Sequence, residues 1–203
     1  MPIDTVIFDF GGVILRYLDP DWLRKNLPYG GLIQEAIYEY LDSDILWDVM
    51  RGKLSEEDFW VGKAQSKGIP LDAMQQYLLA QSAPEQLDQK VLARMRALKG
   101  AYKLGILSNA SDSTRALLEG HYHLNALVDD IVISAEEGLV KPEPELYLLA
   151  ARRLGTLPER CIFVDDMPEN IRTAEDLGMR GVLFTETETT LARLDALLAH
   201  GGL

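Results

Sequence analysis

Five short runs of apolar residues constrain the fold of this chain most strongly. They occupy residues 5–8, 102–107, 130–134, 161–164 and 181–184. Their length and continuous apolar character are typical of strands that are buried on both faces, as in a parallel sheet. Stretches with helical periodicity separate the last four runs, and this alternation predicts helices on both faces of the sheet. The sequence therefore predicts an α/β fold with a doubly wound parallel sheet.

The residues between the first and the second run break this alternation. Helix signals follow one another there: a start at Asp19-Pro20, an amphipathic stretch at 33–41, a capping box at Ser55 before 59–67, and a helix at 71–81. We expect residues 16–84 to form an inserted helical domain. Residues 1–15 and 85–203 would then form the sheet domain.

Composition favours a soluble globular protein and excludes several kinds of partner. Hydrophobic residues make up 47% and charged residues 26% of the 203 residues, which is close to average usage. The formal net charge of −12 opposes binding to nucleic acid and to anionic membrane surfaces. The sequence shows no signal-peptide pattern and no apolar run near the ~18 residues of a membrane span, so we expect a cytoplasmic protein. Cys161 lies in an apolar run, which predicts a buried, unreactive thiol.

Polar residues follow the predicted strands at the points where the strands end. Open parallel sheets bind ligands beyond the carboxyl ends of their strands, so these residues should lie at one edge. They are Asp9 after the first strand, Ser108 and Asn109 after the second, Lys141 beyond the third, and Asp165 and Asp166 after the fourth.

The residue types at this edge indicate a site for a metal ion and a phosphoryl group. Three carboxylates would repel one another without a cation, and oxygen ligands suit a hard ion such as Mg²⁺. Lys141 adds a positive charge, Ser108 adds a hydroxyl, and the turn at Gly11-Gly12 can present backbone N–H groups to an anion. Each residue alone has an ordinary structural explanation, such as a turn or a helix cap. Their joint arrival at one edge favours the functional interpretation.

Four motifs at these positions resemble those of the haloacid dehalogenase-like hydrolases. They are FDFGGV at 8–13, ILSN at 106–109, GLVKPEPELY at 138–147 and FVDDMPENI at 163–171. The resemblance spans essentially the whole chain. It implies a Rossmann-like core with strand order 5-4-1-2-3 and a helical cap after the first motif. The first motif is similar to the D-x-G-[GN]-V pattern of bacterial glucose-1-phosphate phosphatases and of the N-terminal phosphatase domains of epoxide hydrolases.

The resemblance also implies a role for each residue. Asp9 would be the nucleophile that becomes phosphorylated, with Ser108 and Lys141 as its catalytic partners. The phosphoryl group would be held by Gly11, Gly12, Ser108, Asn109 and Lys141. Mg²⁺ would be held by Asp9, the Gly11 carbonyl, Asp165 and Asp166. The expected activity is that of a Mg²⁺-dependent phosphohydrolase acting on a small phosphorylated metabolite, with sugar phosphates among the candidates.

One position departs from the pattern of most phosphatases in this family. They carry a second acid two residues after the nucleophile, which protonates the leaving oxygen, whereas this chain has Gly11. General acid help is typically worth ~10²–10⁴-fold, so a substrate with a good leaving group would suit the site. Alternatively, a bound water or a carboxylate of the inserted domain replaces the acid. The candidates are Asp42, Asp44, Glu56, Glu57 and Asp58.

Three other functions stay open from the sequence. A 2-haloacid dehalogenase would use Asp9 to attack carbon and needs no acid at position 11, but this branch needs no Mg²⁺ and tends to lose the paired acids kept here. A phosphonate-cleaving enzyme would need a Schiff-base lysine such as Lys53, Lys63 or Lys67. A non-catalytic binding or regulatory protein could keep the fold alone. No feature of the sequence predicts the oligomeric state.

Overall fold

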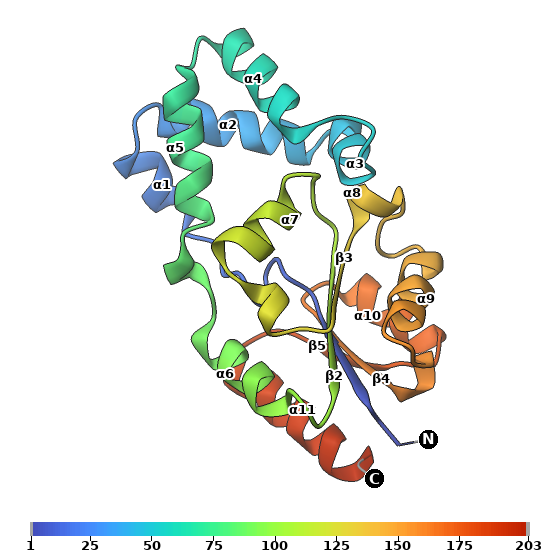
Figure 1. The fold of residues 1–203 in the computed structure, drawn as a ribbon. Coiled ribbons are helices and arrows are strands. Elements are labelled where there is room, and N and C mark those ends of the chain that lie inside the picture. Colours follow the sequence, from blue (N-terminus) through green and yellow to red (C-terminus); the bar gives the residue numbers. More distant parts are fainter. Residues whose placement is uncertain (1, 202–203) are drawn as a thin grey trace.

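A computed structural model describes residues 2–201, and a five-stranded parallel sheet lies at its centre (Figure 1). The strands are β1 (Thr5–Phe8), β2 (Lys103–Ser108), β3 (Asp130–Ile133), β4 (Cys161–Asp165) and β5 (Arg180–Leu183). Their spatial order is β3-β2-β1-β4-β5, which confirms the expected α/β fold and the order 5-4-1-2-3 read from the other edge. Each strand end lies within a residue or two of the predicted position.

The register of the sheet brings the ends of three strands to the same level. Phe8 at the end of β1 pairs with Ile106 of β2 and with Val164 of β4. The Asp9 N–H then donates to the Val164 carbonyl at 2.8 Å. The residues just beyond these three pairing positions are therefore neighbours across the sheet, although they are far apart in sequence.

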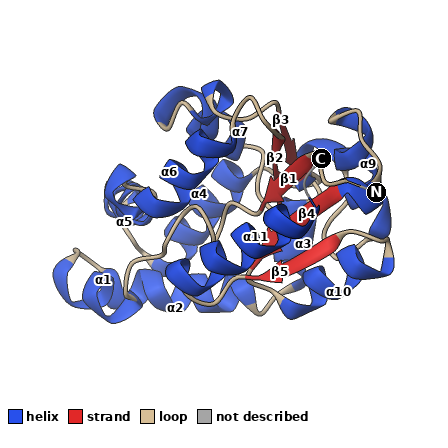
Figure 2. Cartoon of the chain, turned by 90° about the horizontal axis from the view of Figure 1, so that it is seen from below, coloured by secondary structure: helices blue, strands red, loops and turns tan. Residues whose placement is uncertain are grey.

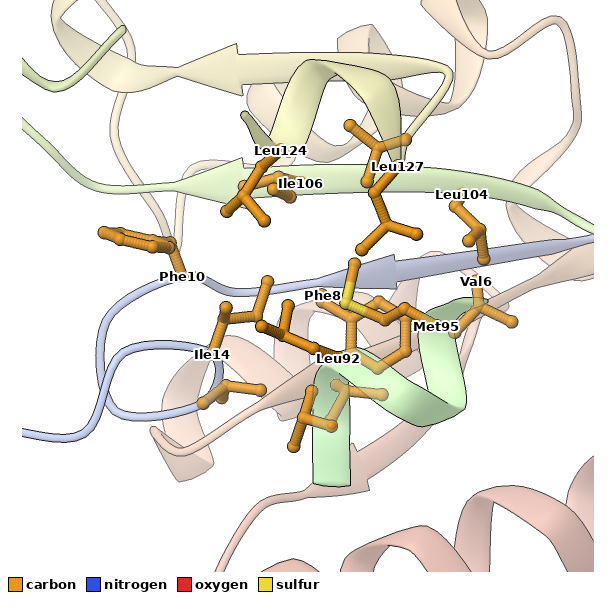
Figure 3. Close-up of a cluster of buried hydrophobic side chains, with 14 of the residues drawn as sticks. Val6, Phe8, Phe10, Ile14, Leu92, Met95, Leu104, Ile106, Leu124 and Leu127 are labelled. Atoms are coloured by element: carbon orange, nitrogen blue, oxygen red, sulfur yellow. The ribbon is translucent and has the colours of Figure 1, made fainter. Parts of the chain in front are cut away.

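Helices cover both faces of the sheet, as Figure 2 shows. Those of the sheet domain are α6 (Gln89–Leu98), α7 (Thr114–Ala116), α8 (Ser134–Glu137), α9 (Pro144–Arg153), α10 (Pro168–Asp176) and α11 (Thr187–Gly201). Because successive strand residues point to opposite faces, β1 feeds two hydrophobic clusters. Val6 and Phe8 pack on one face with Met95 of α6 (Figure 3). Ile7 packs on the other face with Tyr147 of α9.

A separate group of helices lies beyond the carboxyl edge of the sheet, at the top of Figure 1. These helices are α1 (Pro20–Asn26), α2 (Gly30–Leu41), α3 (Asp44–Met50), α4 (Glu56–Lys67) and α5 (Leu71–Gln81). They share their own hydrophobic cluster, which includes Leu23, Ile33, Trp60 and Met74. The sequence signals predicted α1, α2, α4 and α5 but not α3. In α3 only Val49 is buried, while Trp47 is exposed, so a clear apolar stripe is absent.

The chain enters and leaves this helical group through two segments that pair with each other. Leu15 forms an antiparallel bridge with Leu87. The Arg16 N–H donates to the Gln86 carbonyl at 2.7 Å, and the Asp88 N–H donates to the Ile14 carbonyl at 2.8 Å. The division of the chain at residues 15/16 and 84/85 stays a prediction. Across residues 2–201, none of the helices combines the length and the apolar character needed to cross a membrane.

Cys161 provides a test of how the sheet is packed. Its side chain is fully buried at the start of β4, where its thiol donates to the Leu157 carbonyl at 3.3 Å. Burial raises the pKa of this thiol to about 12, with a smaller contribution from Asp4. Because the thiolate is the reactive form, we expect no reaction of the native protein with Ellman's reagent at pH 8. One thiol should react after unfolding in guanidinium chloride, and rapid labelling of the native protein would contradict this packing.

Candidate active site

Three carboxylates meet at the carboxyl edge of the sheet. Asp9 follows β1, Asp165 ends β4, and Asp166 comes next. One oxygen from each carboxylate lies within 4.8 Å of the others. Asp165 is fully buried and Asp9 is 7% exposed, whereas Asp166 is half-buried. The strand register thus produces the acidic cluster that the sequence predicted.

A buried lysine lies inside this cluster. The Lys141 ammonium is 2.9 Å from Asp9 Oδ1 and 2.7 Å from Asp165 Oδ2, and its side chain is 1% exposed. It also lies over the Phe163 ring, 5.6 Å from the ring centre. Burial alone would lower the pKa of Lys141, but the two carboxylates outweigh this effect and raise it. The lysine is therefore charged, and it joins Asp9 and Asp165 at the ends of the adjacent strands β1 and β4.

Asn109 fixes the backbone of this lysine. The Lys141 N–H donates to the Asn109 side-chain oxygen at 2.7 Å, and the Asn109 side-chain amide donates to the Lys141 carbonyl at 2.8 Å. Both ends of the Asn109 amide are thus engaged with the main chain of one residue. Asn109 was predicted from the motif as a contact to substrate, and in this structure its side chain positions Lys141. The neighbouring Ser108 is buried at the end of β2.

The two adjacent aspartates have different surroundings. Asp165 accepts hydrogen bonds from the Met167 N–H at 2.8 Å and from the Asn170 amide at 3.0 and 3.1 Å, in addition to its ion pair with Lys141. Asp166 has a different neighbour, because its carboxyl group lies against the backbone of Gly12. Asp165 is held by protein donors, whereas the carboxylate of Asp166 is available to a ligand.

The two glycines of the first motif lie in a tight turn for separate reasons. Gly12 has φ +76°, and a Cβ there would meet the carboxyl carbon of Asp166 at 2.6 Å. Its N–H donates to the Leu15 carbonyl at 2.9 Å within the turn, so the predicted contact of this N–H with phosphate stays a prediction. At Gly11, a Cβ would lie well inside van der Waals distance of the Tyr17 hydroxyl.

The electrostatics of the cluster suit a hard cation. Burial raises the pKa of Asp9, and the charge of Asp165 adds to this effect, while Lys141 opposes it. Burial and Asp165 likewise raise the pKa of Asp166. The carboxylates therefore disfavour one another's charge, and a cation would relieve this repulsion. An all-oxygen donor set is the type that Mg²⁺ prefers, so the residues present fit this ion.

The inserted helices contact the sheet domain beside the site. Glu56 at the start of α4 accepts hydrogen bonds from Ser111 and Ser113 at 2.6 Å each. Arg51 after α3 donates to both carboxylate oxygens of Glu143 at 3.1 and 2.5 Å. Among the acids considered as replacements for the missing proton donor, Glu56 is thus engaged by serine hydroxyls. The other four, Asp42, Asp44, Glu57 and Asp58, are exposed.

Two residues that lie at the site, Arg16 and Tyr17, were not predicted from the sequence. The Arg16 guanidinium donates to the Gly12 carbonyl and lies 4.9 Å from the centre of the Phe184 ring. Tyr17 places its hydroxyl over Gly11. Both positions depend on how the turn after β1 folds back, and neither residue belongs to a motif that predicts it.

A model of the haloacid dehalogenase-like hydrolase family matches residues 3–178, which is most of the chain. The chain belongs to this family. The resemblance expected from the four motifs is thereby confirmed, and the protein is a haloacid dehalogenase-like hydrolase. The finer assignment to the D-x-G-[GN]-V group stays a prediction.

Named relatives are 26–28% identical to this hydrolase over the residues that align. A sesquiterpene phosphatase of Aspergillus oryzae is 28% identical over 199 residues, covering 96% of each chain. D-ribitol-5-phosphate phosphatase of Bacteroides thetaiotaomicron is 27% identical over 187 residues, covering 87% of this chain and 89% of the relative. Acyl-CoA dehydrogenase family member 10 of Mus musculus is 26% identical over 204 residues, but the chain spans 19% of that protein's length.

Solved structures show the same fold. A hydrolase of this family from Porphyromonas gingivalis has a TM-score of 0.78 and 25% identity, covering 98% of both chains. A family enzyme from Bacteroides thetaiotaomicron, solved as a magnesium complex, has a TM-score of 0.76 and 20% identity, covering 95% of this chain and all of the other. The 2-haloacid dehalogenase from Pseudomonas syringae has a TM-score of 0.65 and 20% identity, covering 98% and 99%. The last two show the fold alone, so the site residues must distinguish the reactions.

The contact between Gly12 and Asp166 gives a test of the acidic cluster. Replacing Gly12 with alanine adds a Cβ at positive φ, which costs about 1–2 kcal/mol of stability, and displaces the Asp166 carboxylate. Gly100→Ala is the matched control, because Gly100 has φ +89° and open space around its Cβ. We expect Gly12→Ala to lose at least as much stability as Gly100→Ala in urea unfolding. Only Gly12→Ala should weaken Mg²⁺ binding in isothermal titration calorimetry, by roughly tenfold or more, and equal affinities in the two variants would refute the contact.

Proposed function

We propose that this hydrolase is a Mg²⁺-dependent phosphatase that acts on a small phosphorylated metabolite and uses Asp9 as its nucleophile. The observation that carries the proposal is the buried Lys141 ammonium between Asp9 and Asp165, with Asp166 left open beside them. The printed names of the full-length relatives, a sesquiterpene phosphatase and D-ribitol-5-phosphate phosphatase, support the same class of reaction.

The hydrogen bonds of Asp9 define which of its oxygens attacks. Asp9 Oδ1 accepts from the Phe10 N–H at 2.7 Å and pairs with the Lys141 ammonium at 2.9 Å. Among the described residues, no donor engages Oδ2. We assign the attack to Oδ2: its lone pair forms a bond to phosphorus, and the bond to the leaving oxygen breaks with its electron pair on that oxygen. A water then attacks phosphorus and releases inorganic phosphate from Asp9.

The donors around Asp9 fit a phosphoryl group at this place. Lys141 supplies a fixed positive charge, and the buried Ser108 supplies a hydroxyl at the end of β2. Asn109 contributes by holding the main chain of Lys141. Fixed charges and donors of this kind account for most of the catalysis in phosphoryl transfer.

Asp9, Asp166 and the Gly11 carbonyl are the groups that would hold Mg²⁺. When bound, the ion would supply positive charge at the phosphoryl oxygens. Asp165 contributes differently in this proposal, because its oxygens already accept from Asn170, Met167 and Lys141. It keeps Lys141 charged and in place.

Residues 16–84 act in this proposal as a cap domain over the leaving group. The cap has its own hydrophobic cluster and rests on the sheet domain through Glu56 and Arg51. In this arrangement the sheet domain performs the transfer and the cap selects the substrate, which we place among small metabolites such as sugar phosphates in the cytoplasm.

The alternative functions receive less support from the site. A dehalogenase has no use for the carboxylate of Asp166 that remains open next to Asp9. A Schiff-base mechanism requires a neutral lysine, but Lys63 and Lys67 both pair with Glu39 at 2.6 and 2.7 Å, and that hydrogen bond raises the pKa of Lys67. A non-catalytic binding or regulatory protein that kept the fold alone would not need a lysine buried between two carboxylates, because burying charges is costly.

The nucleophile assignment predicts a large effect of one substitution. Asp9→Asn retains the shape of the side chain and its hydrogen bond from Phe10, but it removes the nucleophilic oxygen. We expect hydrolysis of p-nitrophenyl phosphate and acetyl phosphate with Mg²⁺ to fall by at least roughly a thousandfold, with the circular dichroism spectrum unchanged. A wild-type protein that releases chloride from 2-chloropropionate without metal, and no phosphate from either ester, would favour the dehalogenase instead.

The different surroundings of the paired acids predict different effects on metal binding. Asp166→Asn removes a ligand, so we expect it to lower Mg²⁺ affinity by about tenfold or more in titration calorimetry. Asp165→Asn removes a charge that pairs with Lys141, so it should lower the free energy of unfolding by about 1.5–3 kcal/mol and leave more of the Mg²⁺ affinity intact. The reverse ranking of the two affinities would show that Asp165 is the direct ligand.

A further inference from the structure

The Tyr17 hydroxyl occupies the place where a side chain at position 11 would begin. A Cβ on Gly11 would overlap this oxygen, and it would lie 3.4 Å from the ring carbon that carries it. Gly11 is two residues from the nucleophile Asp9. A hydroxyl from outside the first motif thus lies over the turn that follows the nucleophile.

The turn after β1 explains how a residue of the connecting segment reaches this place. The N–H groups of Ile14 and Leu15 both donate to the Phe10 carbonyl, at 2.9 and 2.8 Å. Leu15 then lies beside Gly11 in a parallel bridge. The chain is folded back on itself, so Arg16 and Tyr17 follow directly above the glycines.

The surroundings of Tyr17 make it a donor at the mouth of the site. It lines a cleft of about 380 Å³ together with Gly12, Arg16, Asp166, Phe184 and Thr185. The residue as a whole is 62% exposed, whereas its hydroxyl lies over Gly11. An ordinary tyrosine phenol has a pKa of about 10. The phenol therefore keeps its proton at neutral pH.

The leaving group of a phosphate ester needs a donor on this side. In-line attack by Asp9 places the leaving oxygen on the opposite side of phosphorus, toward the opening of the site, and negative charge develops on that oxygen. Tyr17 belongs to the segment that runs from the sheet toward the cap, which is the same side. Glu56, by contrast, is an acceptor that serine hydroxyls already engage.

We propose that the Tyr17 hydroxyl donates a hydrogen bond to the leaving oxygen of the substrate and thereby does the work that a side chain at position 11 would do. This inference rests on the proposed phosphatase function. It extends the substrate class from activated phosphates to esters of ordinary alcohols, because a donor stabilises the alkoxide that departs. Gly11 is then required so that the hydroxyl can reach its place.

The first experiment compares two esters that differ in their need for a donor. With Mg²⁺ present, Tyr17→Phe should lower kcat/KM for glycerol 2-phosphate by roughly tenfold to a hundredfold and for p-nitrophenyl phosphate by less than about threefold, because p-nitrophenolate departs easily. Tyr29→Phe is the matched control, since Tyr29 is also an exposed tyrosine of the inserted segment, and both rates should stay unchanged. Equal losses on the two esters, or no loss on glycerol 2-phosphate, would overturn the inference and leave the phosphatase function standing. A wild-type protein that hydrolyses neither ester would overturn both.

A second experiment uses the space above Gly11 and needs neither activity nor metal. Gly11→Ala adds a Cβ that overlaps the Tyr17 hydroxyl, so it should lower Tm in the wild-type background. In the Tyr17→Phe background the ring carbon is 3.4 Å away, so the same change should cost much less. Non-additive shifts in Tm would show that the two groups compete for one place. Additive shifts would show that the hydroxyl does not occupy it, which would overturn the inference whatever the rates.

Discussion

The ion pairs of Lys141 are the interaction on which the rest of the site depends. A buried ammonium is tolerated only when carboxylates surround it, and here Asp9 and Asp165 supply them from the ends of β1 and β4. Asn109, at the end of β2, fixes the main chain of the lysine. One lysine thus joins the ends of three neighbouring strands, through its ammonium to Asp9 and Asp165 and through its main chain to Asn109.

The same ion pairs leave the site with a charge that matches its proposed ligands. Three carboxylates and one ammonium carry a formal charge of −2 in total, in a chain whose net charge is −12. Burial raises the pKa of both Asp9 and Asp166, and the neighbouring charge of Asp165 adds to this effect. A divalent cation would cancel the negative charge of the site, and a dianionic phosphoryl group could then enter a site that no longer repels it.

The features of the fold and the site that follow from local sequence pattern could be predicted. The apolar runs predict the strands, and the residues that follow them predict which side chains meet at the edge. The helix α3 was missed because only Val49 is buried in it while Trp47 is exposed, so its sequence has no clear apolar stripe. The engagement of Asn109 with Lys141, and of the Gly12 N–H with Leu15, could not be predicted, because each depends on the path of the backbone rather than on residue type.

The position of the Tyr17 hydroxyl could not be predicted from the motifs. A motif aligns a function with a position along the chain, whereas a site needs an atom at a place in space, and the fold can supply that atom from elsewhere. The turn at Phe10–Leu15 and the pairing of Arg16 with Gln86 anchor the chain up to the residue before Tyr17. The backbone that leads into Tyr17 is therefore held by its contacts with the segment around β1 and with Gln86. Glu56 comes near the site through the hydrogen bonds that it accepts from Ser111 and Ser113, so its position depends on how α4 lies against these serines. A donor that must reach the leaving oxygen in every turnover is better carried directly after the anchored segment, which is where Tyr17 lies.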